Sequence, residues 1–333
     1  MKHMKFLSFF LGIAFAIIAC SSNNETIPAP EVDPDGDDGT TEVEFAKGAD
    51  IGWVTEYESK GYNFYNAKGE QRECTALMKE LGLDAIRIRV WVDPSKHGNW
   101  CNTADVVEKA KRAKELGMDV MIDFHYSDWW ADPAQQNKPA SWVGKNLANL
   151  KSAIKDHTVS VLQALKEIGV IPKWVQVGNE IRPGMLWDED VALSGASYNV
   201  TEKDLKDAPA SATDKVVYPM NWANLGAFVT TGYDAVKSVF PDSIVIVHLD
   251  NGWDSGLFTW FFDELKKNGG KWDMIGMSLY PYWSRDAKEG YSSADAVITD
   301  CISNIKALST KYNCDVMVVE TGMECADDNG KLA

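Results

Sequence analysis

Basic residues are scarce in this chain. Lys and Arg number 33 against 49 Asp and Glu, which gives a net charge of −16 at pH 7. Because phosphate groups repel such a surface, the composition argues against a nucleic-acid partner. About half of the negative excess lies in residues 25–44, which hold eight acidic residues and no basic one. This polar, Pro- and Gly-containing stretch is typical of a solvated linker, and we interpret residues 21–45 as a disordered tether.

Apolar runs long enough to cross a membrane are also missing at the N-terminus. The stretch from Phe6 to Ala19 follows a basic start but is too short to span a bilayer comfortably, which predicts an export signal over residues 1–20. It ends in Ile-Ile-Ala-Cys20, which resembles a bacterial lipobox, where cleavage leaves a lipidated cysteine. We therefore expect an exported lipoprotein held at a membrane, at the outer membrane, the cell surface or the periplasmic face. An ordinary signal peptide with a chance cysteine is the alternative.

Cysteine and histidine offer few metal or disulfide sites. Beyond Cys20, the cysteines are Cys74, Cys101, Cys301, Cys314 and Cys325. Five cannot all pair, and both a Cys74–Cys101 disulfide and free buried thiols remain open in a compartment that permits disulfides. His125 has no second His or Cys at ligand spacing, so we expect it to form hydrogen bonds rather than bind a metal.

Tryptophan, in contrast, is abundant. The chain has 13 tryptophans, and 11% of its residues are aromatic. Aromatic rings pack against the flat C–H faces of sugars, although protein cores also use Trp. A Trp-rich, acidic, exported chain therefore favours carbohydrate binding.

Strand-like and helix-like segments alternate from Gly48 to Thr321. The expected strands cover residues 48–54, 84–92, 119–126, 174–180, 243–249, 274–280 and 315–321. The expected helices cover residues 74–81, 104–117, 146–168, 221–239, 257–267 and 294–311. Strict alternation predicts a parallel sheet covered by right-handed crossovers.

Seven strands and six helices are one helix-strand-helix short of an eight-fold barrel, and only residues 322–333 follow the last strand. A doubly wound open sheet is the alternative, but no Gly-rich nucleotide fingerprint follows the first strand, and polar residues close nearly every strand. We predict an α/β fold of the (β/α)8 TIM-barrel type over residues 46–333 that lacks its last helix-strand-helix. The first and seventh strands would then carry unpaired edges.

Polar residues gather where the expected strands end. They are Asp123, His125, Asn179, Glu180, His248, Asp250, Tyr280 and Glu320. Glu180 and Glu320 each end an otherwise apolar strand, where a carboxylate is unfavourable unless something uses it. The fourth and seventh strands of a barrel face each other, which places two carboxylates about 5 Å apart, as in a retaining glycosidase. One would protonate the leaving oxygen while the other attacks the anomeric carbon.

Two arginines accompany this pair. Arg87 and Arg89 alternate along the second strand and point to the same face, so we expect one of them to keep a carboxylate ionised by lowering its pKa. For either Glu alone, a structural ion pair with Arg87, Arg89 or Arg182 is the alternative. The opposed pair of carboxylates favours the catalytic interpretation.

Seven blocks of sequence carry a family resemblance. They are GADIGWV, RVWVDP, DFHYSDWWADPAQQNKPASW, GNEIRPGMLW, VHLDNGW, MSLYPYW and VVET. Their order and spacing, from about Lys47 to Thr321, resemble the endo-β-1,4-galactanases of glycoside hydrolase family 53, which belong to a large clan of (β/α)8 retaining hydrolases. The resemblance implies that Glu180 is the acid/base and Glu320 the nucleophile.

The same resemblance implies roles for the neighbouring residues. Asn179 would contact the sugar 2-hydroxyl, and Arg87 and Tyr280 would orient the nucleophile. The residues implied to line the cleft are His125, Asp128, Trp130, His248, Asp250 and Trp253, and we count Asp123 as a further candidate for binding or orienting the substrate.

Three features depart from the family pattern. The family has a further strand with a Trp-containing segment that floors the site, so we expect the active form to be longer than this chain. The loop from Leu186 to Pro219 looks long, which leaves the subsites there open. Some members bind Ca²⁺ after the seventh strand, where Asp327, Asp328 and Asn329 lie, but the pattern is not an EF-hand loop, and a short acidic turn is our preferred interpretation.

Together these observations predict a lipid-anchored endo-hydrolase that cleaves β-1,4-galactan, as in the arabinogalactan side chains of pectin, with retention and without a required cofactor. A surface glycan-binding protein that does no chemistry is one alternative. A hydrolase of the same clan that acts on another β-linked glycan, such as mannan or xylan, is the other.

Overall fold

The computed structural model describes residues 45–133, 135–187, 222–281, 284 and 293–322. The chain divides into two units, and the fold described below belongs to the unit Ala46–Met323. The predicted signal peptide, with Cys20, and the tether up to residue 44 lie outside the described residues. Across the residues that the structure does describe, no helix is both long and apolar enough to cross a bilayer.

Seven parallel strands form one sheet. They are β1 (Gly48–Asp50), β4 (Ala85–Val90), β5 (Asp119–Phe124), β6 (Trp174–Val177), β7 (Ile244–Leu249), β8 (Met274–Leu279) and β9 (Asp315–Thr321). Their spatial order follows their order in the chain, with β1 and β9 at the two edges. The predicted TIM-barrel fold class is therefore confirmed. The end of the chain beyond Gly322 is not described, so the missing eighth strand stays a prediction.

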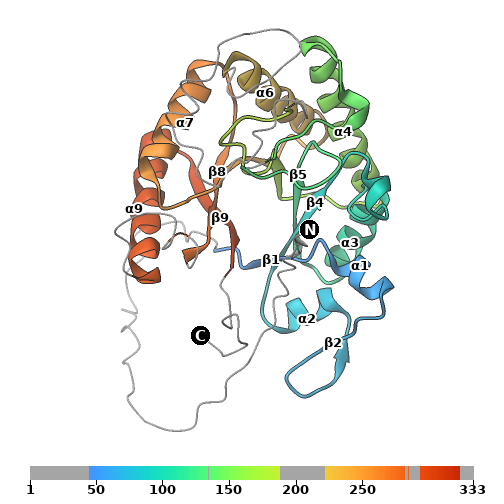
Figure 1. The fold of residues 1–333 in the computed structure, drawn as a ribbon. Coiled ribbons are helices and arrows are strands. Elements are labelled where there is room, and N and C mark those ends of the chain that lie inside the picture. Colours follow the sequence, from blue (N-terminus) through green and yellow to red (C-terminus); the bar gives the residue numbers. More distant parts are fainter. Residues whose placement is uncertain (1–44, 134, 188–221, 282–283, 285–292, 323–333) are drawn as a thin grey trace, which may run out of the picture. The chain divides into compact units, whose positions relative to one another are not determined.

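Helices connect and flank these strands (Figure 1). The six predicted helices are present as α2 (Cys74–Glu80), α3 (Thr103–Glu115), α4 (Leu147–Glu167), α6 (Trp222–Val239), α7 (Ser255–Lys267) and α9 (Ala294–Tyr312). Asn102 and Asn146 cap α3 and α4, because their side chains accept backbone N–H groups of the first turn.

Some short elements were not predicted. They are α1 (Val54–Ser59), the hairpin of β2 (Phe64–Tyr65) and β3 (Gln71–Arg72), and single 3₁₀ turns at Pro94–His97 and Ala140–Trp142. Segments of two to six residues are too short for a hydrophobic period to identify them.

The thiols are free where the structure describes them. Cys74, Cys101 and Cys301 are buried without a disulfide, and Cys314 is partly buried. The Cys74–Cys101 disulfide that the sequence left open is therefore not formed, and the free-thiol alternative holds for these two residues.

The sheet has one apolar region on each of its two faces. The larger one packs the outward side chains of the strands, such as Ile86 and Ile88, against the helices. The smaller one lies inside the barrel and is formed by Ala85, Met121, Trp174, Ile246 and Met274, which all stand near the start of a strand. Since side chains two apart share a face, the next inward residue on four of these strands is Arg87, Asp123, Gln176 or His248. The barrel interior thus changes from an apolar floor to a polar layer toward the strand ends.

The helix α6 approaches β6 closely at Gly232. A Cβ on this residue would lie 2.4 Å from Val177 Cγ1 and 3.0 Å from Tyr126 Oη. We expect Gly232→Ala to lower the free energy of unfolding by about 1–3 kcal/mol, because overpacking outweighs the better helix propensity of Ala. Urea unfolding followed by circular dichroism measures this change.

Gly256 provides the matched control. It is an exposed helical glycine in α7, and a Cβ there would meet only Asp254 Oδ1 at 3.4 Å. Gly256→Ala should leave stability unchanged or raise it by up to about 1 kcal/mol. Equal effects of the two substitutions would contradict the close packing of α6 on β6.

Candidate functional site

The two predicted carboxyl groups meet at the carboxyl ends of the strands. Glu180 follows β6, and Glu320 lies near the end of β9. A carboxylate oxygen of each and a ring nitrogen of His248 all lie within 4.8 Å of one another. An upper limit of 4.8 Å between these oxygens agrees with the spacing in retaining glycosidases, where the carboxyl groups lie about 5 Å apart.

Glu320 is held by a cation and by hydroxyl groups. Arg87 Nη1 lies 2.7 Å from Glu320 Oε1. The hydroxyl of Tyr280 donates to Glu320 Oε2 at 3.2 Å, and the hydroxyl of Ser278 lies 3.4 Å from the same oxygen. These contacts place the carboxyl group of Glu320 beside a positive charge and fix its orientation.

Glu180 has a different environment. It is only 9% exposed, and the Ser278 hydroxyl donates to its Oε1 at 2.5 Å. Burial raises the pKa of Glu180 well above the ordinary value, and the negative charges of Glu320 and Asp250 raise it further. The two carboxyl groups therefore differ in their electrostatic environment. Glu320 lies beside a cation, whereas Glu180 keeps its proton to a higher pH.

Arg87 is the arginine that reaches the carboxylate pair. Besides Glu320, its guanidinium contacts Asp50 Oδ2 at 3.0 Å, Asp123 Oδ2 at 2.9 Å and Asn179 Oδ1 at 2.9 Å. Arg89, which strand alternation had left as an equal candidate, instead pairs with Asp50 Oδ1 at 3.3 Å.

Within the polar layer, Asp123 and His125 form a hydrogen-bonded pair. His125 Nε2 lies 2.9 Å from Asp123 Oδ2, and His125 Nδ1 accepts the backbone N–H of Ala131 at 2.9 Å. Both ring nitrogens of His125 are therefore occupied by hydrogen bonds. Burial alone would raise the pKa of Asp123, but Arg87 and His125 outweigh it, and the pKa lies below the ordinary value.

The other residues implied to line the cleft have distinct places. Asp250 forms a two-pronged ion pair with Arg182, at 2.9 and 2.8 Å. Trp130 is 39% exposed and covers the Arg89 guanidinium, whose carbon lies 4.2 Å from the ring centroid, whereas Trp253 is 8% exposed and packs in the core. The carboxylate of Asp128 accepts hydrogen bonds from the backbone N–H groups of Asp93 and Ala140, and it thereby connects two loops.

Three polar residues in this layer were missed in the sequence. Asp50 ends the first strand, and Gln176 and Ser278 stand on the inward faces of β6 and β8. Gln176 Nε2 donates to Asp123 Oδ1 at 2.6 Å and lies 2.9 Å from His248 Nδ1. The available signal was a polar residue at an inward position of a buried strand, which is unfavourable without a partner.

Glu180, His248 and Glu320 also form the one cluster of possible metal ligands found among the described residues. The donor set fits a metal poorly, since His248 Nε2 lies 2.8 Å from Ser278 Oγ and His248 Nδ1 is engaged with Gln176. A ligating His needs one ring nitrogen free for the metal. The calcium candidates Asp327, Asp328 and Asn329 lie outside the described residues.

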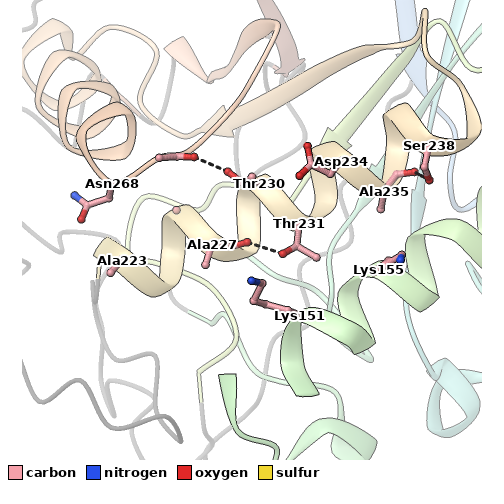
Figure 2. A pocket seen from close by; sticks show the side chains of 12 residues that line it. Lys151, Lys155, Ala223, Ala227, Thr230, Thr231, Asp234, Ala235, Ser238 and Asn268 are labelled. Atoms are coloured by element: carbon pink, nitrogen blue, oxygen red, sulfur yellow. Dashed lines mark hydrogen bonds between the residues drawn. The ribbon is translucent and has the colours of Figure 1, made fainter. Parts of the chain in front are cut away.

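A separate hollow of about 480 Å³ opens in the helical layer (Figure 2). Its lining comes from α4, including Lys151 and Lys155, from α6, and from Asn268 and Gly269 after α7. Two of its hydroxyls already donate to backbone oxygens, Thr230 to Gly269 and Thr231 to Ala227. We therefore interpret this hollow as a gap between packed helices. The carboxyl, imidazole and guanidinium groups described above lie inside the barrel instead.

Comparison with known proteins gives consistent matches. Residues 46–333 match the model of glycosyl hydrolase family 53. A Niallia circulans protein, described as "Uncharacterized protein in bgaB 5'region", is 36% identical over 280 residues, which cover 84% of this chain and 68% of that protein. An arabinogalactan endo-beta-1,4-galactanase of Thermothelomyces thermophilus is 32% identical over 293 residues, covering 86% and 76%. A solved structure described as a fungal beta-1,4-galactanase matches with TM-score 0.69 and 26% identity, covering 84% of this chain and 75% of its own.

Arg87 should be essential for stability as well as for the site. We expect Arg87→Met to lower the free energy of unfolding by about 3–5 kcal/mol, because Asp123 would remain as a buried charge without its cation. Urea unfolding measures the loss. Arg72→Met is the control: this arginine is 36% exposed and pairs with Glu70 and Glu80, so its removal should change stability by at most about 1 kcal/mol. Similar losses in both variants would contradict the role of Arg87.

Proposed function

The chain belongs to glycosyl hydrolase family 53, and on this basis we propose that it is a retaining endo-β-1,4-galactanase acting on the galactan and arabinogalactan side chains of pectin. The observation that carries the proposal is the pair Glu180 and Glu320, within 4.8 Å of each other and in unlike electrostatic environments. The galactanase relatives support the choice of sugar and linkage.

In the first step, the protonated Glu180 gives its proton to the glycosidic oxygen as the bond to the anomeric carbon breaks. Glu320 attacks the same carbon from the opposite face and forms a covalent galactosyl-enzyme. Arg87 and Tyr280 orient the attacking carboxylate through the contacts at 2.7 and 3.2 Å. The raised pKa of Glu180 supports its role as the acid.

In the second step, Glu180 acts as a base. It takes a proton from a water molecule, the water oxygen attacks the anomeric carbon, and the bond to Glu320 breaks, which releases the sugar with its original configuration. Asn179 contacts the sugar 2-hydroxyl in this proposal, and the exposed ring of Trp130 offers a surface for a sugar face. His125, His248 and Asp123 act as the buried support of these groups.

The two carboxyl groups make separable predictions. Glu320→Ala should abolish release of reducing ends from linear β-1,4-galactan, since no nucleophile remains. Glu180→Ala should slow galactan hydrolysis by about 10²–10⁴-fold, but should slow bond breaking far less with an aryl galactoside, whose leaving group needs no proton. Reducing-end assays and burst kinetics measure these effects.

Glu115→Ala, which changes an exposed helical carboxylate, is the control and should match the wild type. Mannan, xylan and cellulose serve as competing substrates, and NMR of the first products gives their anomeric configuration. Near-normal galactan turnover in Glu320→Ala, or equal losses of Glu180→Ala on both substrate types, would refute the assigned roles. Galactan binding without cleavage by the wild type would favour the glycan-binding alternative.

We also propose that the protein is exported and tethered by a lipid on Cys20, on the outer membrane, at the cell surface or at its periplasmic face. The support is the N-terminal sequence, with its basic start, its short apolar stretch and the residues before Cys20. An acidic tether over residues 21–45 would then let the barrel reach a polysaccharide near the membrane.

Lipidation can be tested in a bacterial host that processes lipoproteins. The wild type should incorporate labelled palmitate and sediment with membranes, and Cys20→Ser should lose the label and become soluble. Cys314→Ser, which changes a cysteine in the barrel, should behave as the wild type. Label retained by Cys20→Ser would refute this attachment site.

A further inference from the structure

A bulge in β9 brings Glu320 next to Ser278, which therefore lies between the two carboxyl groups. The pairing of β8 with β9 shifts between Met277 and Ser278, so that Met277 opposes Val318 while Ser278 opposes Glu320. Val319 packs on the apolar floor of the barrel, yet the next residue, Glu320, also reaches Arg87 inside the barrel. The bulge thus turns two consecutive residues inward, which regular alternation forbids.

The Ser278 hydroxyl has three partners in the site. It lies 2.5 Å from Glu180 Oε1, 2.8 Å from His248 Nε2 and 3.4 Å from Glu320 Oε2. The side chain is 2% exposed, so bulk water does not replace these contacts. A hydroxyl carries one hydrogen to donate and two lone pairs that accept, and it rotates freely between these uses.

The proposed reaction places an unusual demand on the partner of Glu180. This residue must be a carboxylic acid in the first step and a carboxylate in the second. A fixed N–H donor would favour the carboxylate alone, and a fixed acceptor would favour the acid alone. A rotating hydroxyl can serve both forms.

We propose that Ser278 is a positioning residue that keeps Glu180 hydrogen-bonded in both protonation states. It donates its O–H to the carboxylate form, and it accepts the O–H of the acid form while its own hydrogen turns to Glu320 or His248. No bond within Ser278 breaks, and the proton that passes to the glycosidic oxygen in the first step comes from Glu180. This inference rests on the proposed function, since the two-step reaction is what requires both forms.

The sign of the effect follows from the charges around Glu180. The titratable or charged groups that face it, directly or through a partner, are Arg87, Asp132, Arg182, His248, Asp250, Tyr280 and Glu320. Burial and the carboxylates raise the pKa of Glu180, and the hydrogen bond from Ser278 opposes them by stabilising the charged form. Removing the hydroxyl should therefore raise this pKa further.

The test compares Ser278→Ala with Ser278→Thr, which keeps a hydroxyl. In Ser278→Ala, kcat/KM on galactan should fall roughly 10-fold, and the alkaline limb of its pH profile should move upward by about one pH unit, the effect of losing a hydrogen bond to a charged group. In Ser278→Thr the alkaline limb should lie at the same pH as in the wild type. Ser243→Ala is the control. It removes a buried hydroxyl that lies just before the start of β7 and donates to Pro172 O at 2.6 Å, and it should leave the alkaline limb unchanged.

A second readout needs no activity. The infrared band of the protonated Glu180 carboxyl is identified by its absence in Glu180→Gln and is then titrated in the folded variants. Persistence of this band to higher pH in Ser278→Ala supports the proposal even if the wild type cleaves no galactan, which would refute the proposed function separately. If Ser278→Ala does not fold, Ser278→Cys, with its weak donor, replaces it. Identical titrations with and without the hydroxyl would overturn the proposal.

Discussion

The polar interior of this barrel depends on one cation, the guanidinium of Arg87. It contacts Asp50 at the end of β1, Asp123 on β5, Asn179 after β6 and Glu320 on β9, at 2.7–3.0 Å. A charge that is 6% exposed is stable only with such partners, and the carboxylates are equally dependent on it. Four strand ends are therefore held in one arrangement by electrostatics, and the orientation of Glu320 is a consequence of this network.

The difference between the two carboxyl groups follows from which of them this cation reaches. Glu320 contacts Arg87, whereas Glu180 has the neutral hydroxyl of Ser278 and the negative charges of Glu320 and Asp250 nearby. Glu180 also adopts a left-handed backbone conformation, with φ of +48°, which non-glycine residues adopt only when their surroundings impose it. Gln136 supplies part of this constraint, because its Nε2 donates to the backbone oxygens of Asn179 and Glu180.

The sequence predicted the strands, the helices and most of the polar layer, because apolar alternation and strand-end residues are local signals. Strand alternation alone could not separate Arg87 from Arg89, because the two residues share a face. The family resemblance named Arg87, and in the structure Arg87 contacts Glu320 whereas Arg89 pairs with Asp50. Gln176 and Ser278 were missed because neutral polar residues carry no charge to draw attention to them. The bulge at β9 was also invisible, and strict alternation from Val319 would have turned Glu320 outward.

The apolar floor of the barrel takes part in the chemistry that the polar layer supports. Met121 and Trp174 precede Asp123 and Gln176 by one inward position, so apolar side chains lie directly beneath the charged network. They exclude water, and a lower local dielectric strengthens both the attraction of Arg87 for its carboxylates and the desolvation that raises the pKa of Glu180. A polar residue in the floor would therefore weaken both effects at once, without touching either carboxyl group. The identity of the floor residues is thus set by the electrostatics of the site as much as by packing.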